Sequence, residues 1–516
     1  MADPAIERLR LERARLQQGG GPERLAKQRA AGKLTARERL ALLYDADTFQ
    51  EWNLWVRHRS THPDLAGREL PGEGVVTGVG SVGERPVYAA SQDFTVVGGS
   101  IGEAGAGKIA ELMDAALRSG HPVLVFNDGA GARIQEGVAA LDGYGQIFYR
   151  NVLLSGVVPQ LSIIAGPCAG GAAYSPALTD FIIQVASVGQ MYITGPSVIR
   201  EVTGEEVTAE ELGGVESHSH YSGVVHFVAA DDAEAVAIAR RLLDFLPANN
   251  TEDPPFLSEL REEALYPDEG FSAIVPADPR EPYDIRDVVR RTVDRSDFLE
   301  VQAAYAANLV IGFGRVAGRT VGLLANQPMV RAGALDIDAS DKAARFIRFC
   351  NAFNIPLVTF VDVPGFLPGV RQELGGIIRH GAKMLFAYAA ATVPKVTVIV
   401  RKAYGGAYLA MCAKAMGADR SCAWPGAEIA VMGAEGAVRV LARKEIDAAP
   451  DPAAELARRA AAYRESFADP RVAAARGMLD DIIEPAETRV YIASALEVLR
   501  SKRELRPQKK HGLIPM

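Results

Sequence analysis

Short apolar runs alternate with amphipathic segments along this chain. The runs Val123–Phe126 and Leu161–Ala165 are apolar throughout and have turn-forming residues at both ends. Such runs are typical of parallel strands that are buried on both faces. Just before the first run, Ile109–Leu117 has apolar residues at helical spacing, which predicts an amphipathic helix. Strands that alternate with helices in this way indicate an α/β fold.

The N-terminal residues 1–45 predict a helical arm that is interrupted at Gly19–Pro22. Thr35 and Glu38 have the spacing of a capping box, which marks the start of a helix. After the arm, glycines break the sequence into short β runs, which we expect at Val75–Val76, Val87–Tyr88 and Phe94–Val97.

The second half of the chain repeats the pattern of the first. The spacing from lysine to aspartate is 20 positions in both halves, from Lys108 to Asp128 and from Lys342 to Asp362. A Gly-Gly-Ala motif follows each aspartate, 42 positions later in the first half and 43 in the second. This period is too long for a solenoid repeat and implies two copies of one α/β domain. The repeated elements are predicted strands at Val321–Ala325, Leu357–Val361 and Val396–Val400, and helices near Ala343–Phe353 and Ile377–Ala390.

The composition of residues 246–255 is that of a linker, so we expect an N-terminal domain at 1–248 and a C-terminal domain at 249–516. Later in the second domain, the alanine-rich segment Ala453–Tyr463 predicts a helix with one face in solvent.

The bulk composition narrows the function. The chain has 516 residues, 48% hydrophobic content and a net charge of −8, which is typical of a globular protein and argues against a nucleic-acid binder, which would show a basic field. It has no run of 18 apolar residues, so we expect no membrane span. Four dispersed cysteines with no CxxC pair argue against a zinc site and fit the reducing cytoplasm. His218, His220 and His226 lie close together but have only Glu216 nearby, so we predict no bound metal.

The two Gly-Gly-Ala motifs are the strongest candidates for chemistry. In each half an apolar strand runs into the motif, at Gly170–Ala172 and at Gly405–Ala407, and a helix follows. Backbone N–H groups at such a turn face outward and can bind an anion, since glycine lets a ligand approach the backbone closely. The alternative is tight packing of helix on strand. Two motifs at matched positions favour two anion-stabilising sites, and therefore a reaction between two activated partners.

Other matched residues leave their roles open. Gly102–Lys108 nearly spells a P-loop, but Ile109 stands where Ser or Thr would reach Mg²⁺, so we do not predict nucleotide hydrolysis. Lys108 and Lys342 either meet a phosphate or carboxylate or cap a surface. Asp128 and Asp362 either act as an acid/base pair or shape the turns after their strands, which is the interpretation we favour. His380 is better placed than the other histidines near the second motif, but a hydrogen-bonding helix residue is the simpler assignment.

Long motifs in the right order resemble one known family across nearly the whole chain. They are similar to the carboxyltransferase (β) subunits of biotin-dependent acyl-CoA carboxylases, and most similar to the β chains of propionyl-CoA carboxylases. The motifs are Ser91-Gln-Asp-Phe-Thr-Val-Val-Gly-Gly-Ser100, Gly131-Ala-Arg-Ile-Gln-Glu-Gly137, Gly166-Pro-Cys-Ala-Gly-Gly-Ala172, Phe360-Val-Asp-Val-Pro-Gly-Phe-Leu-Pro-Gly369 and Ile378-Arg-His-Gly-Ala-Lys383.

The resemblance implies two crotonase-like domains built of ββα units, and a catalytic role for both turns. Gly170, Gly171 and Ala172 would hold the thioester oxygen of an acyl-CoA, and Gly406 and Ala407 the ureido oxygen of carboxybiotin. In this family the biotin anion itself takes the α-proton, and the enolate then attacks CO₂. The family forms hexamers with shared sites and works with a separate subunit that carries biotin carboxylase and biotin.

Two features of this chain qualify the resemblance. It has no Met-Lys-Met biotinylation motif, so biotin must arrive on a partner. Propionyl-type chains carry Asp after Gly-Gly-Ala-Tyr, whereas this chain has Leu409. We expect Leu409, with Tyr174 and Tyr408, to contact substrate, and the apolar residue leaves an acetyl, broader or longer acyl preference open.

Three alternatives remain at this stage. A biotin-dependent decarboxylase or transcarboxylase subunit would use the same half-reaction. A crotonase-type hydratase or isomerase would need an acidic base near Gly170, and the motifs offer none. A non-catalytic assembly core for the biotin-bearing subunit would not need glycine turns in both halves.

Overall fold

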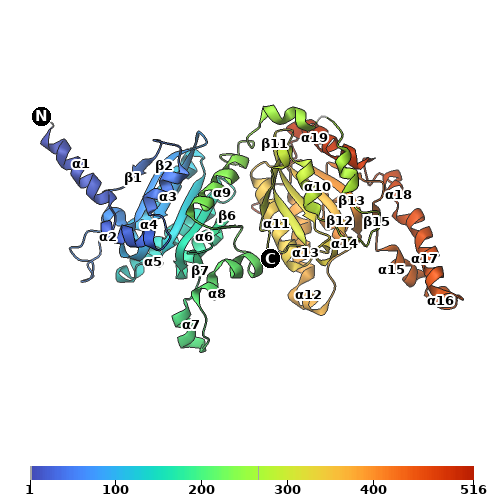
Figure 1. The fold of residues 1–516 in the computed structure, drawn as a ribbon, viewed down its shortest axis with the longest axis horizontal. Coiled ribbons are helices and arrows are strands. Elements are labelled where there is room, and N and C mark those ends of the chain that lie inside the picture. The colour runs from blue at the N-terminus through green and yellow to red at the C-terminus, as the bar shows by residue number, and fades with distance from the viewer. Residues whose placement is uncertain (1–2, 265) are drawn as a thin grey trace. The chain divides into compact units, whose positions relative to one another are not determined.

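The chain divides into two compact units, Met1–Glu252 and Asp253–Met516. The structure is a computed structural model that describes residues 3–264 and 266–516, so the first two residues of the predicted arm lie outside it (Figure 1). Each unit is built on an eight-stranded sheet, and the two sheets have the same strand order.

In unit 1 the sheet order is β1-β2-β3-β4-β5-β6-β8, with β7 paired to β5. The first pairs are antiparallel and the pairs from β3 onward are parallel. Its strands are β1 Gln50–Trp52, β2 Val75–Val82, β3 Arg85–Gln92, β4 Val123–Gly129, β5 Gln160–Ala169, β6 Phe181–Val185, β7 Gln190–Tyr192 and β8 Phe227–Ala229. Its helices are α1 Pro4–Gln17, α2 Pro22–Ala30, α3 Ala36–Leu43, α4 Glu103–Ser119, α5 Val138–Leu154, α6 Tyr174–Leu178, α7 Pro196–Thr203, α8 Ala209–Gly213 and α9 Asp232–Phe245.

Unit 2 repeats this order as β9-β10-β11-β12-β13-β14-β16, with β15 paired to β13. Its strands are β9 Leu299–Val301, β10 Leu309–Val316, β11 Arg319–Asn326, β12 Leu357–Val363, β13 Lys395–Tyr404, β14 Arg420–Ala423, β15 Glu428–Ala430 and β16 Asp481–Ile482. Its helices are α10 Ile285–Thr292, α11 Ile337–Ala352, α12 Val370–Gly375, α13 Ile377–Ala390, α14 Gly405–Ala410, α15 Ala434–Leu441, α16 Arg443–Asp447, α17 Pro452–Tyr463, α18 Pro470–Ala475 and α19 Thr488–Val498.

Burial on both faces explains the apolar runs of the central strands. Every residue of β4 and of β12 is buried. Helices α4 and α5 pack on one another in unit 1, and α11 and α13 do the same in unit 2. The predicted α/β duplication is therefore confirmed, as are the capping box at Thr35 and Glu38 and the alanine-rich helix.

One predicted strand is wrong. Strand β3 ends at Gln92, and Phe94–Val97 forms a turn instead. The Asp93 carboxylate accepts a hydrogen bond from the Thr95 N–H at 3.0 Å, and the Val96 N–H donates to the Asp93 carbonyl at 3.0 Å. A local side-chain hydrogen bond of this kind stabilises a turn and overrides the strand preference of the β-branched residues.

The segment that resembled a P-loop is helical. Gly102 precedes α4, and Glu103 to Lys108 form its first turns. Lys108 is buried, and its Nζ donates to the carbonyl oxygens of Gly72 at 2.7 Å and Val75 at 2.5 Å. This geometry excludes both roles we had left open for Lys108, because the side chain meets backbone and not a phosphate or a surface.

Lys342 has the same role in unit 2. Its buried Nζ donates to the carbonyl oxygens of Gln302 at 2.9 Å, Tyr305 at 2.7 Å and Leu309 at 2.7 Å. Each lysine thus joins its helix to the start of a strand and to the loop before that strand: Lys108 to β2, and Lys342 to β10. Burial lowers the pKa of Lys342 to about 7 and that of Lys108 to about 8.

Replacing Lys342 by Met should destabilise unit 2 by about 3 kcal/mol, because three carbonyl oxygens, two of them in buried hydrogen bonds, lose their donor. Chemical denaturation followed by circular dichroism measures this cost. The wild-type free energy of unfolding should also rise with pH above about 7, because an unfolded lysine, with a pKa of about 10.4, binds more protons there than the folded one.

That rise should be smaller in the Met variant. An exposed lysine, Lys444, changed to Met serves as the control for the loss of one charge. Equal stability and equal pH dependence in the Lys342→Met and wild-type proteins would contradict the assigned role.

Candidate active site

The two Gly-Gly-Ala turns lie at equivalent places in the two sheets. Strand β5 runs into a short 3-10 helix at Gly170–Ala173, and β13 runs into α14 at Gly405. Gly170 has φ +64° and Gly405 has φ +58°, in the left-handed region. Side-chain-bearing residues are strained there, so glycine lets each strand pass directly into the following helical turn.

The second glycine of each motif faces open space. A Cβ added at Gly171 would have no described atom within 4 Å, and one at Gly406 would meet only Phe366 Cε2 at 3.9 Å. By contrast, a Cβ at Gly143, where α5 packs on α4, would lie 2.6 Å from the Ala106 Cβ. The packing explanation for Gly171 and Gly406 is therefore wrong, and the space in front of both is large enough for a ligand to approach the backbone.

The residue before each turn does not cap it. Ala169 and Tyr404 precede the first helical residues, and neither provides a side-chain hydrogen bond to the following N–H groups. The first N–H groups of a helical turn have no partner within the helix, so they remain as donors for a ligand oxygen. Their alignment also adds partial positive charge at the turn.

A second loop approaches each turn, and the sequence analysis missed it. In unit 1 an isolated parallel bridge joins Ile101 to Ala132, and in unit 2 another joins Leu335 to Phe366. The hydrogen bonds of each bridge come from the flanking residues, such as the Arg133 N–H to the Ile101 carbonyl at 2.9 Å. The N–H groups of Ala132 and Phe366 therefore point away from the bridge.

The loop of Ala132 lies against the first turn, because a Cβ added at the neighbouring Gly131 would lie 2.7 Å from the Ala169 carbonyl oxygen. Phe366 lies near the second turn, because its Cε2 would lie 3.9 Å from a Cβ added at Gly406. The sequence signal was present: Ala132 and Phe366 each stand four positions after the matched aspartates.

The matched aspartates hold the strands that carry these loops. Asp128 is buried at the end of β4 and pairs with Lys33 and, at 2.8 Å, with Arg39. Asp362 is buried at the end of β12, where it pairs with Arg401 at 3.0 Å and accepts a hydrogen bond from the Tyr283 hydroxyl at 3.0 Å. Burial raises the pKa of Asp128, although the two cations oppose this shift. Both carboxylates are fully engaged, which supports the structural role and not acid/base chemistry.

The histidines are also engaged. His380 Nδ1 lies 2.8 Å from Asp341 Oδ1, which also accepts a hydrogen bond from Lys383 at 2.7 Å. His218 contacts the Met191 carbonyl oxygen, and His226 accepts the Ile182 N–H. Among the described residues, no group of three His, Cys, Asp or Glu side chains is arranged to hold a metal ion.

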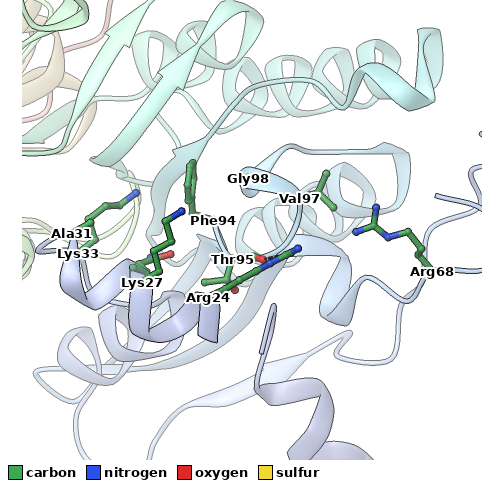
Figure 2. A pocket seen from close by; sticks show the side chains of 10 residues that line it. Arg24, Lys27, Ala31, Lys33, Arg68, Phe94, Thr95, Val97 and Gly98 are labelled. Atoms are coloured by element: carbon green, nitrogen blue, oxygen red, sulfur yellow. Dashed lines mark hydrogen bonds between the residues drawn. The ribbon is translucent and has the colours of Figure 1, made fainter. Parts of the chain in front are cut away.

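A cationic pocket of about 420 Å³ lies beside the first unit's sheet (Figure 2). Arg24 and Lys27 enter it from α2, Lys33 from the segment after α2, and Arg68 from the opposite side. Phe94 presents its ring to the interior, and Val97 and Gly98 form part of the wall. The buried Gln28 lines the pocket, and its Oε1 has no hydrogen-bond partner among the residues that the structure describes. Four cations and an unmatched acceptor indicate a ligand with phosphate groups and an N–H or O–H donor.

Comparison with known proteins identifies the family. The model of the carboxyl transferase domain matches residues 27–514. The chain is 58% identical over 510 residues to the methylmalonyl-CoA carboxyltransferase 12S subunit of Propionibacterium freudenreichii subsp. shermanii, which covers 99% of this chain and 97% of that protein. The chain belongs to the carboxyl transferase family. It is a carboxyltransferase, as the resemblance of its motifs implied.

Other relatives of this carboxyltransferase carry different activity names. This chain is 54% identical over 517 residues to the methylmalonyl-CoA decarboxylase subunit alpha of Propionigenium modestum, with 100% of both chains covered. It is also 54% identical over 511 residues to the propionyl-CoA carboxylase carboxyltransferase subunit of Haloferax mediterranei, with 99% of both covered.

The crystal structure of transcarboxylase 12S, described as a hexamer with methylmalonyl-CoA and methylmalonic acid bound, has a TM-score of 0.97 and 57% identity, covering 100% of this chain and 99% of that one. The expected crotonase-like fold is thereby confirmed.

The predicted substrate-contacting residues of this carboxyltransferase differ in exposure. Tyr174, directly after the first turn, is 51% exposed, and Leu409, at the matched position after the second, is 40% exposed. Tyr408 is buried at 5% exposure.

Among the described residues, no helix has both the length and the apolar character needed to cross a bilayer.

The two glycines of the second turn should respond differently to alanine. Gly405→Ala should lower stability by about 1–2 kcal/mol, because φ is positive and the new Cβ would lie 3.0 Å from the Val431 carbonyl oxygen. Gly406→Ala should leave stability within about 0.5 kcal/mol of wild type, since the new Cβ would meet only Phe366 Cε2, at the ordinary contact distance of 3.9 Å. Thermal unfolding of both variants checks this, and equal losses would contradict the described turn.

Proposed function

We propose that this carboxyltransferase moves a carboxyl group between carboxybiotin and the α-carbon of a short acyl-CoA, propionyl-CoA or acetyl-CoA. The biotin would arrive on a separate biotin carboxylase and biotin carrier subunit, because this chain has no biotinylation motif. The observation that supports this proposal is the pair of matched, open and uncapped turns, one in each unit. An enolate and a ureido anion each concentrate charge on one oxygen, which preorganised N–H donors stabilise.

At the first turn, Gly170, Gly171 and Ala172 would bind the thioester oxygen through backbone N–H groups. The Ala132 N–H, from the neighbouring loop, is the natural second donor. Charge grows on this oxygen as the α-proton leaves, so donors fixed in advance lower the barrier. Removing one such donor in other acyl-transfer sites costs about 10²–10³ in kcat.

At the second turn, Gly406 and Ala407 would bind the ureido oxygen of biotin, with the Phe366 N–H as the second donor. Carboxybiotin supplies the carboxyl group and, once that group has left, a ureido base for the α-proton. The protein then needs no side chain as base, in agreement with the engagement of His380 by Asp341. The buried Tyr408 would support this turn from within.

The cationic pocket would bind the nucleotide part of coenzyme A. The phosphates of CoA match Arg24, Lys27 and Arg68, and its adenine ring can stack on Phe94. An amino or hydroxyl group of the nucleotide would satisfy Gln28 Oε1, the buried acceptor that lacks a partner.

We propose that this chain assembles as a hexamer, which is the assembly described for the transcarboxylase 12S relative. Along α5, Val138, Leu141 and Val152 are 60–83% exposed, which is the kind of apolar surface that a second copy would cover. The four unpaired cysteines fit a place in the cytoplasm.

The partner would decide the direction of the reaction. Relatives named as transcarboxylase, decarboxylase and carboxylase share about half or more of their residues with this chain. All three activities contain the same carboxyl transfer, so a decarboxylase or transcarboxylase role remains the second proposal. Leu409 and Tyr174 border the turns and would set the acyl preference.

Carboxyl transfer from methylmalonyl-CoA and malonyl-CoA to free biotin tests the function. The wild-type chain should transfer from at least one ester, and Gly171→Val should lower kcat by about 10²–10³ because its side chain fills the space in front of the donors. Leu409→Asp should change the ratio of kcat/KM for the two esters by about tenfold.

Leu178→Asp is the matched control for Leu409→Asp, since Leu178 is equally exposed, at 40%, but is the last residue of α6 in unit 1 and does not belong to the helix of the second turn. Full activity in a folded Gly171→Val protein would contradict the oxyanion role. An assembled wild-type protein that transfers from neither ester would favour a non-catalytic assembly core.

A further inference from the structure

Lys33 lies between the cationic pocket and the first turn. It lines the pocket, and its Nζ sits 4.3 Å from the centre of the Phe94 ring (Figure 2). The same Nζ forms an ion pair with Asp128, at the end of β4. Lys33 is only 8% exposed, so its contacts with ring and carboxylate fix its position.

The Lys33–Asp128 pair touches both strands that carry the N–H donors of the first turn. Asp128 belongs to β4, which leads into the Gly131–Ala132 loop. The pair also lies directly over Gly166 of β5, where an added Cβ would collide with Asp128 Oδ1 and lie 2.7 Å from Lys33 Nζ. Gly166 stands four positions before Gly170.

The pocket wall is joined to the same loop by a second contact. The Ala130 N–H donates to the carbonyl oxygen of Gly98, which lines the pocket, at 3.1 Å. A Cβ at Gly99 would collide with the Asp128 carbonyl oxygen, so no side chain separates the wall from the end of β4. A ligand that orders the pocket therefore acts on the segment that leads to Ala132.

Unit 2 shows that the structural task does not require a lysine. There the matched Asp362 takes its cation from Arg401 of β13, the position that corresponds to Gly166, and its second partner is the neutral hydroxyl of Tyr283. In unit 1 the corresponding strand residue is Gly166, which has no side chain to pair with Asp128. The cations come instead from Arg39 and Lys33 of the N-terminal arm. Arg39 is shared between Asp128 and the buried Asp232, which it contacts at 2.8 Å, so Lys33 balances the second carboxylate of this cluster and does so from a position that also lines the pocket.

We propose that Lys33 is a positioning residue that couples occupancy of the cationic pocket by the CoA nucleotide to the alignment of the N–H donors at the first turn. A bound nucleotide excludes water from Lys33, which strengthens its attraction to Asp128 and holds β4 and β5 in register. Binding energy from the remote nucleotide is thereby used in the transfer step, and not only in binding. This inference rests on the proposed function.

The test compares methylmalonyl-CoA with the pantetheine thioester of methylmalonate, which lacks the nucleotide, as carboxyl donors to free biotin. The wild-type kcat should be at least about tenfold higher with the CoA ester. In Lys33→Gln, which keeps a hydrogen-bond donor for Asp128 but loses the charge, that ratio should fall by about tenfold. Lys33→Arg should keep most of the ratio.

Tyr283→Phe is the matched control, because it removes the corresponding partner of Asp362 in unit 2, and it should lower kcat for both esters by the same factor. Calorimetric binding of adenosine 3′,5′-bisphosphate separates contact from coupling: its Kd should rise only a few-fold in Lys33→Gln.

The inference is overturned if Lys33→Gln lowers kcat equally for both esters, which is a structural role, or changes only KM and Kd, which is simple contact. A wild-type protein inactive with both esters would instead refute the proposed function, and the inference with it.

Discussion

The structure depends on one constraint: a buried strand must end in a turn whose N–H groups face nothing. Such a turn requires a residue at positive φ, no capping side chain and no atom in front of the next residue. The first turn meets these conditions with Gly170 at φ +64° and open space at Gly171, and the second with Gly405 and Gly406 in the same roles. Unpaired donors are costly when buried and useful when a ligand oxygen reaches them, so the rest of each unit serves to hold the strands rigid behind the turn.

Duplication supplies both turns, and the two units differ in the residues that hold the strands behind them. Asp128 and Asp362 hold matched strand ends, but the cation opposite Asp362 comes from its own sheet, whereas those opposite Asp128 come from the N-terminal arm. The arm that supplies them also supplies Arg24 and Lys27 to the cationic pocket. The phosphate-rich CoA proposed for the first unit would explain why that unit uses a separate arm, and the uncharged ring system of biotin proposed for the second would need none.

The sequence predicted the duplicated α/β fold and the two turns, because buried parallel strands and repeated glycines leave strong local patterns. It was wrong at Phe94–Val97, where the Asp93 carboxylate stabilises a turn against the strand preference of the residues. It did not find Ala132 and Phe366, because a backbone donor has no side-chain signature. Nor did it find the cationic pocket, since Arg68 and Arg24 come together only through the fold. Lys108 and Lys342 were recognised as a pair, but their carbonyl partners lie 33 to 40 positions away.

The most direct measurement is a crystal structure of this carboxyltransferase with methylmalonyl-CoA and biotin. The account predicts the thioester oxygen within about 2.7–3.2 Å of the backbone nitrogen of Gly171 or Ala172, and the ureido oxygen at the same distance from that of Gly406 or Ala407. A thioester oxygen held by side chains, or either ligand bound with its oxygen turned away from its turn, would contradict the account.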